Sequence, residues 1–92
     1  MTCKYHVIYT PHAKKQLAKM DRAISGHIFS WIGEKLVDSE DPYSVGLKLT
    51  GELSGMIRYR VGDYRIIAKI CDKELIILVI EVEHRKKIYS RL

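Results

Sequence analysis

The sequence predicts one α+β domain, spanning residues 1–92, in which a short N-terminal strand and two helices precede a three- to four-stranded antiparallel sheet, with the helices on one face. Its 92 residues are 47% hydrophobic and 29% charged, which suits a small globular chain with a single core. Apolar residues recur at helical spacing in the first half, and after about residue 45 they recur at every second position. A run of helices followed by a run of strands is typical of α+β domains.

The first half predicts a short strand and two helices. Residues 4–9, KYHVIY, are rich in β-forming side chains and predict the strand. Thr10 and Pro11 then predict a helix start, with Thr as the N-cap and Pro at the first helical position. Asp21 can cap a second helix, which the SEDPY segment at 39–43 ends. The apolar stripe of this second helix consists of Ile24, Ile28, Trp31, Ile32 and Leu36.

The second half predicts an antiparallel meander of three or four strands. MIRYRV at 56–61 and YRIIAKIC at 64–71 flank Gly62-Asp63, which is a typical two-residue hairpin loop. A second turn at Asp72-Lys73 leads into ELIILVIEV at 74–82, whose apolar character suits a central strand.

The hairpin register sorts the side chains by type. With Gly62-Asp63 as the loop, Arg60 lies opposite Arg65, and Arg58 lies opposite Ile67. The apolar face, which the helices should cover, then holds Ile57, Tyr59, Val61, Tyr64, Ile66, Ala68 and Ile70. The opposite face holds Met56, Arg58, Arg60, Arg65, Ile67 and Lys69. Four cations thus share one side of the hairpin with no acid among them. Because like charges directly opposite destabilise a strand pair, this arrangement predicts a site for an anion.

The last strand is expected to bring the C-terminal segment to this site. With Asp72-Lys73 as a two-residue loop, Ile70 lies opposite Leu75, and Tyr64 lies opposite Glu81. The segment that begins at His84 then arrives beside Arg65.

Charge and composition narrow the function classes. The net charge is +5, and residues 84–91 contain Arg85, Lys86, Lys87 and Arg91 without any acid, a distribution that favours a nucleic-acid partner. No apolar run approaches the ~20 residues needed to span a bilayer, and the N-terminus lacks signal-peptide features, so we expect a cytoplasmic protein. The two Cys residues form no C-x-x-C motif, and the remaining His residues, His6, His12 and His27, lack metal-ligand spacing, so no metal or cofactor is predicted.

The combination of RYRVGDYRIIAKI, a hydrophobic strand and HRKKIY resembles the RelE/ParE superfamily of bacterial and archaeal toxins, specifically its RelE branch. The resemblance covers nearly the whole chain, and its most specific motif is GDYR at 62–65 followed by HRKKIY at 84–89. It implies a RelE-like fold and a toxin of a type II toxin–antitoxin system that enters the ribosomal A site and cleaves mRNA. It also implies neutralisation by a cognate, RelB-like antitoxin in a hetero-oligomeric complex.

By position, the resemblance implies an active site of Arg58, Arg65, Arg85 and Tyr89. Three features depart from the family pattern. Met56 stands where some members have Lys, and Glu83 replaces the Gly of Gly-His-Arg or Gly-Lys-Arg. Tyr89 also follows Arg85 more closely than in some relatives.

A metal-free ribonuclease must activate a 2′-hydroxyl, stabilise a dianionic transition state and protonate the leaving 5′-oxygen. Arg65 suits the second task, because its planar guanidinium can bind two phosphate oxygens; the alternative is a surface ion pair with Asp63 or Glu81. Arg58 suits phosphate binding and is a poor base. Arg85 can stabilise the leaving group or belong to a solvated basic tail.

His84 is a candidate proton carrier, since imidazole titrates near neutral pH, and Glu83 could tune it or act as the base. Tyr89 can stack on an exposed base or pack back on the sheet. The other expected RNA contacts are Arg60, Lys69, Lys86, Lys87 and Arg91.

Two alternatives remain open at this point. A ParE-like DNA gyrase poison would share the fold but would need no Arg–His–Tyr site. A non-catalytic basic module, such as an inactive toxin or co-repressor, would fit the departures at Met56 and Glu83.

Overall fold

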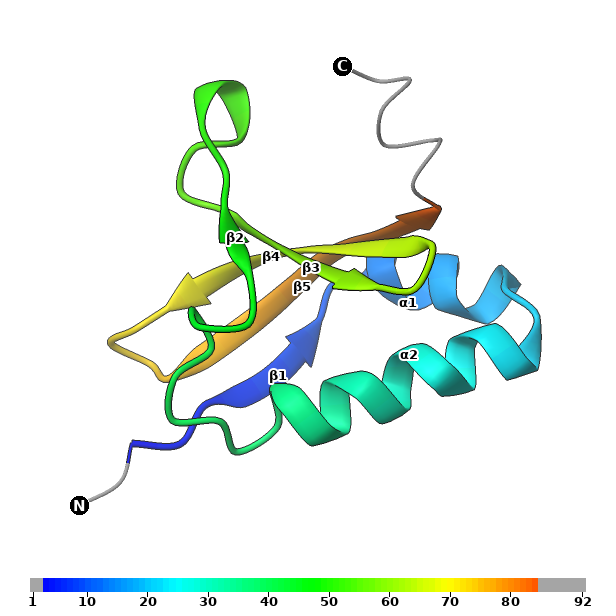
Figure 1. Ribbon diagram of the computed structural model, residues 1–92, viewed down its shortest axis with the longest axis horizontal. Helices are drawn as coiled ribbons and strands as arrows, with labels where there is room; N and C mark the ends of the chain where they lie inside the picture. Colours follow the sequence, from blue (N-terminus) through cyan, green and yellow to red (C-terminus); the bar gives the residue numbers. More distant parts are fainter. Residues whose placement is uncertain (1–2, 85–92) are drawn as a thin grey trace.

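The computed structural model describes residues 3–84 and shows two helices packed on a five-stranded sheet (Figure 1). The elements, in chain order, are β1 (His6–Tyr9), α1 (Pro11–Lys19), α2 (Arg22–Lys35), β2 (Leu47–Lys48), the 3-10 turn η1 (Gly51–Leu53), β3 (Ile57–Val61), β4 (Tyr64–Cys71) and β5 (Ile76–His84). None of the helices in this part of the chain is long and apolar enough to cross a membrane.

The sheet has the strand order β1-β5-β4-β3-β2. The predicted antiparallel meander is confirmed for β3, β4 and β5. The sheet is wider than predicted because β1 pairs with β5 in parallel at one edge, while the two-residue β2 pairs with β3 at the other. The result is a mixed α+β sheet in which β5 is central along its first half.

Both predicted helix starts are confirmed. The Thr10 hydroxyl oxygen accepts a hydrogen bond from the Ala13 N–H at 3.1 Å, and Pro11 occupies the first helical position. The Asp21 carboxylate accepts from the Ala23 N–H at 3.2 Å and caps α2. Local sequence therefore determines where both helices begin.

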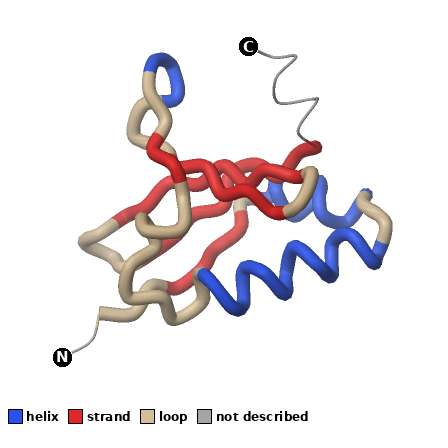
Figure 2. The backbone as a smooth tube through the Cα atoms, viewed as in Figure 1, coloured by secondary structure: helices blue, strands red, loops and turns tan. Residues whose placement is uncertain are grey.

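The core lies between α2 and the sheet. Ile28, Ile32 and Leu36 from the predicted stripe are buried, and Tyr59 of β3 is completely buried beneath them. The Tyr59 ring lies 5.7 Å from that of Trp31, and its hydroxyl donates a 2.7 Å hydrogen bond to the Pro42 carbonyl. The segment containing η1 projects from the opposite side of the sheet (Figure 2).

The register of the β3–β4 hairpin is confirmed. Val61 pairs with Tyr64, Arg60 with Arg65, and Arg58 with Ile67. Gly62 has a φ of 59°, which the first position of this tight turn requires and glycine adopts without strain. The predicted apolar and cationic faces of the hairpin follow directly.

The predicted β4–β5 register is wrong. Ile70 pairs with Ile77 rather than Leu75, and Tyr64 pairs with His84 rather than Glu81. Part of the difference arises in the loop, which occupies residues 72–75 rather than two residues and ends at Leu75 with a positive φ of 55°.

A β-bulge supplies the rest of the difference. Ala68 pairs with Val79 whereas Ile67 pairs with Glu81, so Ile80 is an extra residue on β5. The bulge coincides with the end of β1, where the Thr10 hydroxyl donates to the Ile80 carbonyl at 3.1 Å. Because side chains alternate along a strand, this single residue reverses which face each later side chain of β5 occupies.

Candidate functional site

Three arginines of the β3–β4 hairpin lie on the sheet face opposite the core. We call this surface, defined by Arg58, Arg60 and Arg65, the Arg face. Arg60 is exposed, Arg58 is half-buried, and Arg65 is only 4% exposed. Lys69 is exposed farther along the same face of β4. The structure therefore brings together the four hairpin cations that the sequence predicted, and it gives Arg65 a buried position that does not suit a surface ion pair.

Two acids from β5 also lie on the Arg face. Glu83 is directly opposite Arg65, and Glu81 is opposite Ile67. The hairpin itself carries no acid on this face, as predicted, and the bulge at Ile80 brings both glutamates of β5 onto it. Glu83 is 8% exposed. The cations of β3 and β4 thus share this face with the two carboxylates of β5.

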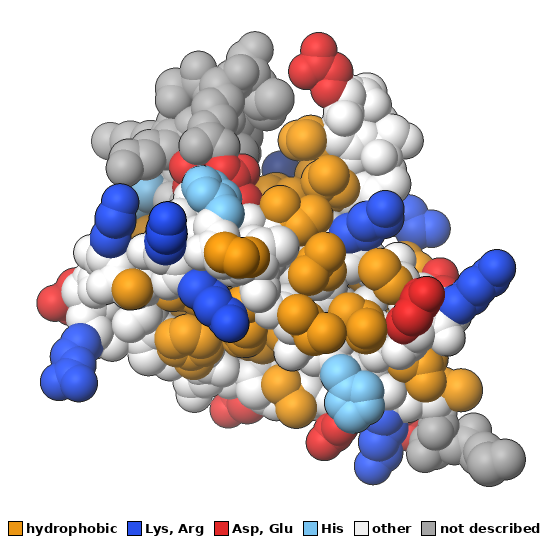
Figure 3. Space-filling model, turned by 180° about the vertical axis from the view of Figure 1, so that it is seen from behind, with side chains coloured by type: hydrophobic (Ala, Val, Ile, Leu, Met, Phe, Trp, Pro, Cys, Tyr) orange, Lys and Arg blue, Asp and Glu red, His pale blue; other side chains and the backbone are white. Residues whose placement is uncertain are grey.

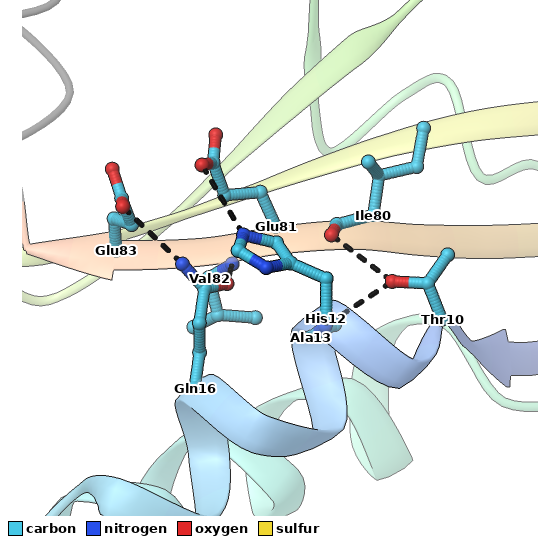
Figure 4. Close-up of polar contacts among 8 residues, drawn as sticks. All are labelled: Thr10, His12, Ala13, Gln16, Ile80, Glu81, Val82 and Glu83. Atoms are coloured by element: carbon cyan, nitrogen blue, oxygen red, sulfur yellow. Dashed lines mark hydrogen bonds and ion pairs between the residues drawn. The ribbon is translucent and has the colours of Figure 1, made fainter.

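Helix α1 contacts the edge of β5 that lies beyond the end of β1 (Figure 4). The Gln16 side-chain oxygen accepts a 2.7 Å hydrogen bond from the Val82 N–H, and its NH₂ group donates to Glu83 Oε1 at 3.2 Å. One turn earlier, His12 Nε2 lies 3.7 Å from Glu81 Oε1. Sequence reasoning did not identify Gln16, although a polar residue three positions after the buried Ala13 lies on the packed side of the helix.

His84 lies on the helix side of the sheet. Its ring packs edge-to-face on Tyr64, with 5.2 Å between the ring centroids. Both rings line a hollow of about 460 Å³, which is also lined by Val82 and Glu83 of β5 and by residues of α1 and the α1–α2 turn, among them Gln16 and Lys19. The structure therefore separates His84 from Arg65, because the two side chains project from opposite faces of adjacent strands.

Five predicted site residues lie outside the described part of the chain. They are Arg85, Lys86, Lys87, Tyr89 and Arg91. The last described residue, His84, pairs with Tyr64 next to the Gly62-Asp63 turn, so this segment begins at the Arg65 end of the sheet.

A second polar cluster lies at the other end of β4 and was not predicted. The Asp72 carboxylate accepts hydrogen bonds from the Tyr5 hydroxyl at 2.8 Å and from the Tyr43 hydroxyl at 2.8 and 2.9 Å. Burial and the bond to Asp72 raise the pKa of Tyr43 to about 12, and the bond to Asp72 is the main cause of a raised pKa at Tyr5. The cluster ties three loops together and is remote from Arg65.

The side of the molecule that faces away from the viewer in Figure 1 combines apolar and cationic side chains on its surface. Figure 3 shows hydrophobic side chains across the middle of this surface and Lys and Arg side chains around them. Ile8 of the edge strand β1 is 45% exposed, and Lys14, Lys15 and Lys19 are exposed on α1. The charge distribution favours an anionic ligand or partner.

Comparison with known proteins identifies a consistent set of relatives. Residues 7–89 match the family described as ParE toxin of type II toxin–antitoxin system, parDE. The chain is 32% identical to Toxin RelG of Mycobacterium tuberculosis over 87 residues, which cover 95% of this chain and 98% of that protein. It is 27% identical to Toxin RelE of the same organism over 85 residues, which cover 92% of this chain and 86% of the relative.

Solved structures give the same result. The toxin–antitoxin complex RelBE2 of Mycobacterium tuberculosis matches with a TM-score of 0.79 and 30% identity, covering 89% of this chain and 99% of that chain. A mutant of the Escherichia coli toxin RelE in the free state matches with a TM-score of 0.71 and 19% identity, covering 95% and 92% of the two chains. The second likeness concerns the fold, and it confirms the predicted RelE-like architecture.

Proposed function

The chain belongs to the RelE/ParE superfamily of type II toxin–antitoxin toxins, and from this premise we propose that it is a metal-independent, ribosome-dependent endoribonuclease that cleaves translated mRNA in the A site. The observation that carries the proposal is the Arg face, where Arg58, Arg60 and Arg65 share one surface beside the start of the basic C-terminal segment. A gyrase poison needs no such cluster on the sheet.

The proposed reaction is an internal transfer at one phosphate. The 2′-oxygen attacks the adjacent phosphorus as its proton leaves to a base, and the bond from phosphorus to the 5′-oxygen breaks as an acid protonates that oxygen. The products are a 2′,3′-cyclic phosphate and a free 5′-hydroxyl. The protein must therefore bind a phosphate whose negative charge increases in the transition state, and it must supply two proton carriers.

Arg65 is assigned to transition-state stabilisation. Its guanidinium is nearly buried, and Glu83 lies directly opposite on β5, so its charge acts with little freedom to reorient. Arg58 binds the same or the adjacent phosphate. Arg60 and Lys69, both exposed, hold the RNA backbone on either side.

Two groups near the end of β5 can carry a proton. Glu83 shares the Arg face, whereas His84 lies behind it against Tyr64. The geometry favours Glu83 as the acceptor of the 2′ proton, and a role for His84 requires the substrate to reach around the end of the strand. The dependence of the cleavage rate on pH distinguishes the two groups. The rate should change with pH as the proton-transferring group titrates, and substitution of that group by Gln, but not of the other, should remove this change.

The C-terminal segment completes the proposed site. Arg85 stabilises the leaving group, and Tyr89 stacks on an exposed base to separate the two nucleotides. Lys86, Lys87 and Arg91 contact the RNA backbone. These assignments rest on the family resemblance and on the position at which the segment leaves β5.

We further propose that a RelB-like antitoxin binds this chain in a hetero-oligomer and that the toxin acts in the cytoplasm. Solved relatives crystallised as toxin–antitoxin complexes support the first point, with the Mycobacterium tuberculosis RelBE2 complex at 30% identity. Ribosomes and translated mRNA, the proposed targets, support the second.

The test is cell-free translation followed by primer-extension mapping of mRNA 5′ ends. We expect cleavage of translated mRNA only, lost in Arg65→Ala and Arg85→Ala and retained in Lys35→Ala, which removes an exposed cation on α2. Intact mRNA with inhibited DNA supercoiling would instead identify a ParE-like gyrase poison. Intact mRNA with unaffected supercoiling would identify a non-catalytic binding or co-repressor module.

A further inference from the structure

Beyond Val79, the outer edge of β5 pairs with no strand among residues 3–84, so other groups must hold the strand in place beside Arg65. Pairing with β1 ends at Val79, and β5 continues for five more residues to His84. A buried strand edge needs hydrogen-bond partners for its backbone groups. The start of α1 supplies the first of these, because Thr10 donates to the Ile80 carbonyl.

Gln16 supplies the next partner and does so with both ends of its amide. Val82 is 1% exposed, and its N–H donates to Gln16 Oε1 at 2.7 Å. The Gln16 NH₂ group then points to Glu83 Oε1 at 3.2 Å (Figure 4). Because a backbone N–H can only donate and a carboxylate can only accept, these partners fix the orientation of the amide.

Among the long, flexible side chains, only glutamine satisfies both partners. A glutamate could accept from Val82 but could not donate to Glu83, a lysine or arginine could donate but not accept, and methionine would leave both bonds unmade. Gln16 is the only carboxamide side chain in the whole sequence, which contains no Asn. It is anchored on α1 between the buried Ala13 and Leu17.

We propose that Gln16 is a positioning residue of the RNA site: it holds Val82 and Glu83 of β5 so that Glu83 stays opposite Arg65. The inference rests on the proposed endoribonuclease activity. Gln16 acts through Glu83 and the backbone of β5. A displacement of about 1 Å at a reacting group can reduce a rate by about 10²-fold, so a helix residue outside the Arg face can control the chemical step.

Two variants separate the two hydrogen bonds. Gln16→Met removes both of them and keeps the length of the side chain. Gln16→Glu keeps an acceptor for the Val82 N–H, removes the bond to Glu83 and places a second carboxylate beside it. Ala18→Met, an exposed and neutral change two residues along the same helix, is the matched control.

The kinetic measurement is single-turnover cleavage of mRNA on programmed ribosomes, at temperatures where denaturant unfolding shows each variant to be folded. For Gln16→Met and Gln16→Glu we expect a saturating rate lowered about 10- to 100-fold, with the half-saturating toxin concentration changed less than about 2-fold. Ala18→Met should match the wild type. Saturating rates within about 3-fold of wild type in both Gln16 variants, or losses that follow the unfolded fraction, would overturn the proposal.

Hydrogen exchange at the Val82 amide tests the same inference without any activity. We expect faster exchange at this amide in Gln16→Met, protection retained in Gln16→Glu, and unchanged exchange at Val79 in both. Equal protection of Val82 in all three proteins would refute the positioning role. If wild-type protein cleaves no mRNA while Val82 responds as expected, the proposed function fails and the structural role of Gln16 stands.

Discussion

Removal of one hydroxyl group from the core should test how the loop after α2 is attached to the sheet. Tyr59 is completely buried, and its hydroxyl donates to the carbonyl of Pro42, which is also fully buried, at 2.7 Å. Tyr59→Phe deletes this donor and keeps the aromatic ring in its contact with Trp31. The substitution therefore isolates the hydrogen bond from the packing around it.

The expected cost follows from the acceptor left behind. Water cannot reach the Pro42 carbonyl without opening the core, and a buried polar group left unsatisfied costs about 1–3 kcal/mol. No large cavity term is added, because the ring still fills the site. In a domain of this size, about 1 kcal/mol corresponds to a shift of about 4–8 °C in Tm.

Urea unfolding monitored by the fluorescence of Trp31, the only tryptophan, measures the change directly. Tyr64→Phe is the matched control, because Tyr64 is only partly buried and its hydroxyl makes no hydrogen bond within residues 3–84; we expect a change within about 0.5 kcal/mol. A loss below about 0.5 kcal/mol in Tyr59→Phe would show that the Pro42 carbonyl finds another donor, and the reasoning would fail.

Three further predictions concern other parts of the fold. Gly46→Ala should destabilise the protein by about 1–3 kcal/mol, measured by urea unfolding, because its methyl group would lie 2.7 Å from atoms of both Ile57 and Tyr59. Thr10→Ala should lower the free energy of unfolding by about 0.5–2 kcal/mol through loss of the α1 cap. The loss should lie toward the upper end of this range because the hydrogen bond to the Ile80 carbonyl is also removed, whereas Thr10→Ser should retain most of the stability in the same assay. The pKa of Tyr43 in the folded protein is about 12 against an ordinary 10.0, so this hydroxyl should stabilise the fold fully below pH 10 and progressively less as the pH rises toward 12. When the free energy of unfolding is measured by urea unfolding across this pH range, it should fall less steeply in Tyr43→Phe than in the wild type. Equal slopes in the two proteins would contradict the assignment.

The parts of the fold that depend on local chemistry could be predicted from the sequence. Thr10-Pro11 and Asp21 determine the helix starts, and Gly62-Asp63 determines the β3–β4 register, because each places a residue with a specific conformational or hydrogen-bonding role at a fixed position. The grouping of the hairpin arginines follows from that register.

The β4–β5 register depends on features without a local sequence pattern. The loop ends at Leu75 with a positive φ, which a leucine rarely adopts, so the sequence favoured a shorter turn. The extra residue at Ile80 is stabilised by Thr10, 70 positions earlier in the chain. The predicted pairing of Tyr64 with Glu81 was consequently wrong, and the contacts of Gln16 with β5 could not be foreseen, because both depend on long-range contacts.

The bulge at Ile80 has a consequence for how the gene can vary. Loss of that single codon would leave every residue of the proposed site intact and would exchange the faces of all later side chains of β5, turning His84 toward Arg65 and Glu83 toward the helices. A protein altered in this way would keep its composition and most of its alignment to relatives. Among homologues, the number of residues in β5 between Val79 and Glu83 is therefore as informative about this site as the identity of the residues that form it.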